Sequence, residues 1–223
     1  MKTLYLYILL IILSLEVNAG APAPSTSLPE PPYVFEKGTL ITVDVEWNKN
    51  SFRKFIPSDI KIDEVVNGGI EVFFTKSEKP LAKINYVLIW INLQNDYKKL
   101  ILGFVGPNYD SNRIIEKISE KKLTLAKSRL MIINEKVSLR TSINNKLSFN
   151  ISGNINANCK KNENKSNKIE ISKSKTFSIT HKSDSVCNLD STNITFTEDY
   201  SDIKANKILN TRIFKNAKVT FSY

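Results

Sequence analysis

The chain has 223 residues, of which 41% are hydrophobic and 24% are charged, and its formal net charge is +10. This balance excludes an intrinsically disordered chain, because enough apolar residues are present to bury a core. The length predicts one large or two small domains.

Residues 1–19 have the three-part layout of a secretory signal peptide. A short basic start precedes an apolar run from Leu4 to Leu15, and Val17 and Ala19 stand at the −3 and −1 positions before Gly20. The apolar run is shorter than the roughly 20 residues that a membrane-spanning helix needs. We therefore expect cleavage between Ala19 and Gly20 and export to the periplasm, the cell surface or the medium, with no membrane span in the mature chain.

Residues 20–38 are predicted to form an extended leader. Five of the eight prolines of the chain lie within residues 20–32, where apolar periodicity is missing. Residues 39–223 are then expected to form the folded domain, and an alternative division has two subdomains that meet near residues 106–128.

The folded part begins with a clear strand pattern. Ile41, Val43, Val45 and Trp47 alternate with polar residues, which predicts a strand with one buried face and one wet face. Strands expected at 60–66 and 70–75 flank Asn67-Gly68-Gly69, which is typical of a hairpin turn.

The rest of the chain continues as short strands separated by turn residues. A near-continuous apolar run at 84–93 predicts a central strand. Asn144-Asn145 predicts a second hairpin, and residues 153–167 are expected to form an exposed loop. One short amphipathic helix is expected after Asp110. The fold class that follows is mostly β, an antiparallel immunoglobulin-like β-sandwich with one short helix. Its further strands are expected at 99–105, 129–133, 136–143, 146–151, 168–172, 176–181, 193–196, 207–214 and 217–223.

Cys159 and Cys187 are the two cysteines of the chain. In an oxidising compartment such a pair predicts one disulfide, with two free thiols as the alternative. Two cysteines and the single His181 cannot supply the four ligands of a structural zinc site.

The sequence contains few signs of catalysis. It has neither a phosphate-binding glycine loop nor a Gly-x-Ser-x-Gly motif. His181 lies between Thr180 and Lys182, which favours a surface position. We therefore predict a non-enzymatic protein with no catalytic residues, no metal site and no cofactor.

Lysines concentrate near the predicted disulfide, at Lys160, Lys161, Lys165 and Lys168. They form a candidate patch for an anionic glycan or lipopolysaccharide, with an ordinary solvated surface as the alternative. Nucleic acid is not expected as a partner, because aromatic residues for base stacking are not interleaved with these lysines. Asn150, Asn164 and Asn193 fit the glycosylation pattern, and the sequence leaves open whether they are modified.

The two ends of the chain suggest a function. An alternating strand near the mature N-terminus (Ile41, Val43, Val45, Trp47) and a last strand with Val219, Phe221 and Tyr223 resemble those of chaperone–usher fimbrial subunits. The resemblance implies a cell-adhesive surface subunit, whose N-terminal strand completes the sheet of another copy or binds an assembly chaperone. Two alternatives remain, namely a monomeric secreted or periplasmic module that binds an anionic ligand or partner protein, and a small outer-membrane β-barrel.

Overall fold

The computed structural model describes residues 30–53, 65–75, 84–92, 97–107, 113–117, 123–172 and 175–222. The expected signal peptide, the expected cleavage point at Ala19 and Gly20, and most of the proline-rich segment lie outside these residues. Within the described ranges, no helix is both long and apolar enough to cross a membrane.

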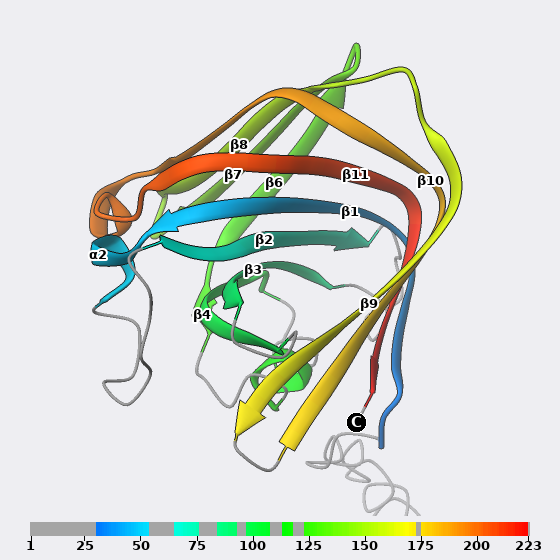
Figure 1. Ribbon diagram of the computed structural model, residues 1–223, viewed down its shortest axis with the longest axis horizontal. Coiled ribbons are helices and arrows are strands. Elements are labelled where there is room, and N and C mark those ends of the chain that lie inside the picture. The colour runs from blue at the N-terminus through cyan, green and yellow to red at the C-terminus, as the bar shows by residue number, and fades with distance from the viewer. Residues whose placement is uncertain are drawn as a thin grey trace, which may run out of the picture.

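The chain is mostly β, as predicted (Figure 1). Its helical parts are α2 (Lys49–Phe52), a single turn at residues 113–117 and the 3-10 turn η5 (Glu198–Tyr200). The strands are β1 (Tyr33–Asn48), β2 (Val65–Thr75), β3 (Asn85–Asn92), β4 (Tyr97–Val105), β5 (Thr124–Leu125), β6 (Lys127–Ile133), β7 (Lys136–Ile143), β8 (Lys146–Ile155), β9 (Lys160–Ser172), β10 (Lys175–Phe196) and β11 (Ala205–Ser222).

Seven of these strands form a nearly closed, barrel-like ring. Their order is β11, β1, β2, β3, β4, β9 and β10, and β10 also pairs with β11. All neighbours in the ring are antiparallel except β4 and β9, which are parallel. An immunoglobulin-like sandwich is therefore not the arrangement that this structure has.

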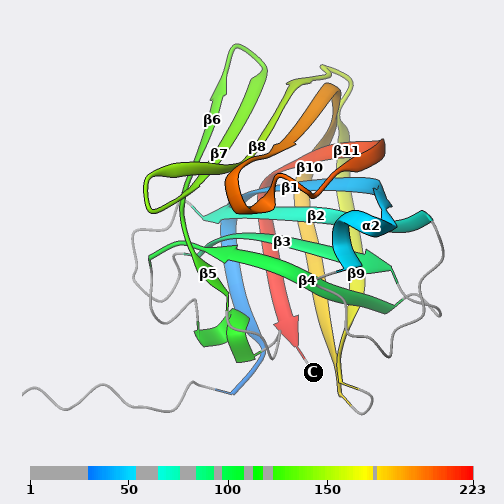
Figure 2. The same ribbon diagram turned by 90° about the vertical axis from the view of Figure 1, so that its left-hand side faces the viewer.

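The strands β8, β7 and β6 extend from the far end of β10 and pack against the outside of the ring (Figure 2). The layer between them is the outer core. It contains Val137 and Leu139 of β7 and Phe149 and Ile151 of β8, together with Ile41, Val43, Val45 and Trp47 of β1. The four alternating β1 residues are fully buried, and β1 pairs on both sides within its own chain, with β2 and with β11.

A second apolar cluster, the inner core, fills the ring. Phe35 and Phe221 meet there edge to face, with ring centres 5.8 Å apart, and Trp90, Phe73 and Phe214 belong to the same cluster. Because Leu40 and Thr42 of β1 are also buried on this side, β1 does not have the wet face that its alternation predicted. The strand also begins at Tyr33, within the segment expected to be a leader.

The hairpin expected at Asn67-Gly68-Gly69 is wrong, because β2 runs straight through these residues. The glycines serve a close packing contact instead of a turn. A Cβ atom on Gly68 would lie 2.2 Å from the Trp90 carbonyl oxygen and 2.6 Å from Trp47 Nε1. The indole N–H of Trp47 donates a hydrogen bond to that same carbonyl at 3.3 Å.

The hairpin expected at Asn144-Asn145 is confirmed, with φ values of 50° and 65°. The long loop expected at residues 153–167 is wrong, because β8 continues to Ile155 and β9 begins at Lys160. The strand expected at 168–172 is the end of β9, and the separate strands expected after it are parts of two long strands, β10 with 22 residues and β11 with 18 residues.

Candidate active site

Three ionisable side chains meet inside the ring, two from the consecutive strands β2 and β3 and one from the distant strand β10. Glu71 of β2 accepts a hydrogen bond from the Tyr86 hydroxyl of β3 at 2.6 Å. His181 Nε2 of β10 lies 3.1 Å from the same Glu71 oxygen. Each of the three residues is at most 1% exposed. We call this group the buried triad.

The charges of the buried triad depend on one another. Burial by itself raises the pKa of Glu71, but the electrostatic attraction of His181 and the hydrogen bonds from His181 and Tyr86 outweigh this effect. The nearby charge of Lys98 contributes as well, so the pKa of Glu71 lies below its ordinary value. Burial, followed by the Glu71 charge and hydrogen bond, raises the pKa of Tyr86 well above its ordinary value. The carboxylate therefore stays ionised and the phenol stays protonated at neutral pH.

Several buried polar atoms around the triad have no hydrogen-bond partner among the described residues. They are His181 Nδ1, Ser183 Oγ and Thr42 Oγ1. Thr42 is the direct cross-strand neighbour of Glu71, and Ser183 follows His181 by two positions on β10. Buried polar groups in native proteins are normally paired with protein or with ordered water. These atoms are therefore available to bind water or a polar small molecule.

Lys98 is the lysine whose charge acts on the buried triad, because it helps to lower the pKa of Glu71. Its ammonium lies 4.3 Å from the centre of the Trp90 ring, and Trp90 belongs to the inner core. Lys98 is only partly buried, and Lys99 follows it on the opposite face of β4. An amine held against an apolar interior is a typical arrangement for a reactive lysine.

The cysteines and lysines that the sequence analysis selected as site residues do not belong to the buried triad. Cys159 and Cys187 form a disulfide. Lys160 and Lys161 begin β9, and Lys165 and Lys168 follow along its backbone at positions opposite His181 and Ser178. In the described part of the chain, no group of three or more His, Cys, Asp or Glu side chains could hold a metal ion.

His181 was expected at the surface and is fully buried, so that prediction is wrong. Sequence reasoning also missed Glu71, Tyr86 and Lys98. One signal was present: Glu71 is the single charged residue in the run from Ile70 to Thr75. A lone charge in an apolar strand is costly unless a partner neutralises it.

No family model and no curated protein matches the sequence. The fold is similar to three solved enzyme structures. Acetoacetate decarboxylase from Legionella pneumophila subsp. pneumophila str. Philadelphia 1 aligns with a TM-score of 0.61 at 12% identity, over 95% of this chain and 93% of that one. The enduracididine biosynthesis enzyme MppR complexed with pyruvate has a TM-score of 0.59 at 9% identity, over 90% and 92%. An acetoacetate decarboxylase-like enzyme from Sphingomonas wittichii RW1 has a TM-score of 0.56 at 10% identity, over 92% and 96%.

These similarities correct the functional prediction. The resemblance to fimbrial subunits is wrong, because 90–95% of the chain aligns with the fold of acetoacetate decarboxylase-like enzymes instead. The prediction of an adhesive surface subunit depended on that resemblance and is corrected with it. The prediction of a non-enzymatic protein depended on the missing catalytic motifs, and the similarity to enzyme structures contradicts it. At these identities the similarity shows the fold, and the chemistry has to be argued from the chain's own residues.

Proposed function

We propose that the protein is an enzyme that acts on a small carbonyl compound bearing a carboxylate, and that it makes or breaks a carbon–carbon bond next to the carbonyl. The observation that carries this proposal is the buried triad, in which ionisable groups are kept inside an apolar ring. Perturbed ionisable groups of this kind are enriched at active sites. The fold adds support, since one similar protein decarboxylates acetoacetate and another was crystallised with pyruvate.

In this proposal Lys98 supplies the nucleophile. Its neutral amine adds to the carbonyl carbon, water leaves, and a protonated imine forms. In a β-keto acid such as acetoacetate, the bond between the α-carbon and the carboxylate then breaks, carbon dioxide leaves, and the electron pair passes to the imine nitrogen to give an enamine. Protonation of the enamine carbon and hydrolysis by water release the product and the free Lys98 amine. His181, held in place by Glu71, carries the proton that the carbon finally receives, because an imidazole can both donate and accept a proton near neutral pH.

Chemical trapping tests the role of Lys98. Borohydride should reduce the imine formed with acetoacetate or pyruvate, and mass spectrometry should find the added mass on the peptide that contains Lys98. Lys98→Arg should abolish this adduct and lower the rate of substrate loss by about 100-fold or more. Lys99→Arg, on the opposite face of the same strand, is the matched control and should retain both. An adduct that persists in Lys98→Arg would remove Lys98 from the proposal.

A second experiment separates catalysis by the triad from a purely structural role. His181→Gln should lower kcat by about tenfold or more and flatten the pH dependence of kcat, with KM changed less than kcat. Near-ultraviolet circular dichroism establishes that the variant is folded. If His181→Gln is folded and has the activity and pH profile of the parent, the triad only stabilises the ring.

We also propose that the chain is exported and cut between Ala19 and Gly20. The support is the charge and hydropathy pattern of residues 1–19. Mass spectrometry of the protein recovered outside the cytoplasm should give an N-terminus within two residues of Gly20. An intact Met1 on that protein contradicts this proposal.

A further inference from the structure

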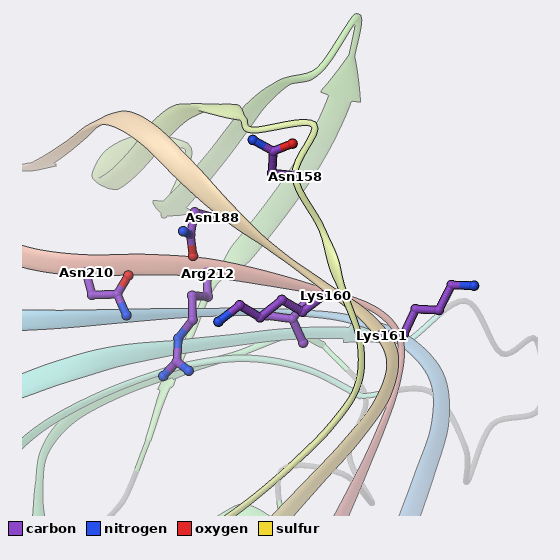
Figure 3. Close-up of a pocket in the computed structure, with 7 residues that line it drawn as sticks. Asn158, Lys160, Lys161, Asn188, Asn210 and Arg212 are labelled. Carbon is purple, nitrogen blue, oxygen red and sulfur yellow. The ribbon is translucent and has the colours of Figure 1, made fainter.

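A pocket of about 490 Å³ opens where the start of β9 meets β10 and β11 (Figure 3). No member of the buried triad lines it, and none of its described lining residues is acidic. We propose that this pocket binds a small anion with hydroxyl groups beside its charged group, such as a sugar acid or a sugar phosphate. The polar side chains that line it are Asn158, Lys160, Lys161, Asn188, Asn210 and Arg212.

Arg212 is held in position to receive an oxyanion. Its side chain is 17% exposed, and its Nη2 lies 3.8 Å from an Asp44 carboxylate oxygen. Its guanidinium carbon lies 5.7 Å from the centre of the Phe214 ring. A guanidinium fixed in this way loses little freedom on binding and presents a planar fork that matches carboxylate and phosphate oxygens.

Lys160 adds a second cation on the same side of the sheet. Figure 3 shows Lys160 and Arg212 extending toward the same space, whereas Lys161 extends away from it. This arrangement follows from β-strand geometry, because consecutive side chains point to opposite faces. Asp44 offsets one of the two converging positive charges, so the pocket keeps an excess of positive charge.

The asparagines suit the hydroxyl groups of such a ligand. Each side-chain amide offers two N–H donors and one carbonyl acceptor, so it can pair with a hydroxyl in either direction. Asn188 stands directly opposite Arg212 in the β10–β11 pairing. Asn210 precedes Arg212 by two positions on the same face of β11. The volume lies within the range of about 300–1,000 Å³ that is typical of small-molecule sites.

The disulfide braces this pocket from the opposite face of the sheet. Cys159 precedes Lys160, and Cys187 stands between Val186 and Asn188. Val186 faces the inner core, whereas Cys187 belongs to the outer core. Lys160 and Val186 are direct partners in the β9–β10 pairing. The bridge therefore fixes two lining strands without occupying the pocket.

Isothermal titration calorimetry of the full chain tests the proposal with D-gluconate, D-glucose 6-phosphate and neutral D-glucose. At least one anion should bind at about millimolar Kd or tighter, and glucose about tenfold more weakly or not at all. Binding of gluconate alone identifies a carboxylate ligand, and binding of glucose 6-phosphate alone identifies a phosphate ester. Failure of both anions, or equal binding of glucose, overturns the proposal.

Matched variants locate the binding. Lys160→Gln and Arg212→Gln should each weaken the anion by about tenfold, whereas Lys182→Gln, at an exposed lysine of β10 that does not line the pocket, should change Kd by less than about twofold. The double variant Cys159→Ser/Cys187→Ser should weaken it as well while remaining folded. Lys98→Arg should bind as the parent does, so the outcome is independent of the proposed reaction. An equal loss in Lys160→Gln and Lys182→Gln would indicate general attraction to a basic surface and would overturn the site.

Discussion

Glu71 brings a carboxylate into an apolar interior, and its stability there depends on His181 and Tyr86. Glu71→Gln should lower the free energy of unfolding by about 3 kcal/mol, because it removes the negative partner of His181 and weakens the bond from Tyr86. Urea unfolding at pH 7 measures this change. Glu46→Gln is a suitable control, because Glu46 is only partly buried on neighbouring β1 and should change stability by less than about 0.5 kcal/mol.

The difference between the parent and Glu71→Gln should also depend on pH. The pKa of Glu71 is lower in the folded chain than its ordinary value of 4.5. The carboxylate therefore contributes its full stabilisation above that value and loses it as the pH falls through the folded pKa. Unfolding curves of the two proteins at pH 7, 5, 4 and 3 should converge toward the acid end. A constant difference across this range contradicts the assignment.

Gly68 is required for the contact between Trp47 and Trp90. Gly68→Ala should cost about 1–3 kcal/mol, because the added methyl group has to displace a backbone carbonyl and a buried indole. Gly106→Ala is the matched control, since its Cβ atom would meet nothing closer than 3.4 Å. Thermal unfolding of the two variants gives the comparison. Equal losses in both would assign the effect to backbone freedom instead of packing.

For single residues, the sequence predicts burial well where the side chain is itself apolar. It predicts burial poorly where a polar side chain is buried because of a distant partner. Ile41, Val43, Val45 and Trp47 were expected to be buried and are. His181 was misplaced because its neighbours Thr180 and Lys182 are polar, whereas its partner Glu71 is 110 positions away. No local pattern encodes a pairing over that distance.

Among the elements, the β7–β8 hairpin depends on two asparagines in the left-handed region, at φ 50° and 65°. Asn145→Gly should be neutral or stabilising by up to about 1 kcal/mol, because glycine adopts that region freely. Asn145→Val should destabilise by about 1–2 kcal/mol, since a β-branched residue is strained there. Urea unfolding of both variants tests the order, and equal stabilities would contradict the turn assignment.

Elements were predictable where turn residues and apolar alternation agree, as in β6, β7 and β8. Elements were not predictable where polar residues lie within a strand. Ser183, Asp184 and Ser185 interrupt the apolar pattern of β10, and Asn210 interrupts that of β11. Both strands continue because backbone pairing satisfies their peptide groups regardless of side-chain polarity: β10 pairs with β9 and β11 around Ser183 and Ser185, and Asn210 pairs with Asp44 of β1.

For the molecule as a whole, the disulfide links Cys159, just before β9, to Cys187 of β10, which lies 28 positions further along the chain. Replacing both cysteines by serine should lower the free energy of unfolding by about 3–4 kcal/mol on the chain-entropy account. Urea unfolding of the oxidised parent and the double variant measures the loss. The oxidised parent treated with reductant should match the variant, and a parent that is insensitive to reductant contradicts a formed bridge.

The closure of the ring could not be derived from the sequence. Hairpins join neighbours along the chain, whereas the ring closes by pairing β1 with β11 and β4 with β9. The strands β1 and β11 pair with each other because each brings an apolar face to the same inner core, as Phe35 and Phe221 show. The alternation of apolar and polar residues in the sequence identifies those faces, but it does not encode the curvature of the strands.

The parallel joint between β4 and β9 has a consequence for where the ring opens. It contains two register pairs, Tyr97 with Lys168 and Lys98 with Ile169, and every other joint of the described ring has more. Transient opening is easiest where the fewest backbone bonds have to break. Amide hydrogens on both sides of this joint should therefore exchange faster than those of β1 and β2. Lys98 belongs to this joint, so transient opening there should also expose the backbone that carries the proposed nucleophile.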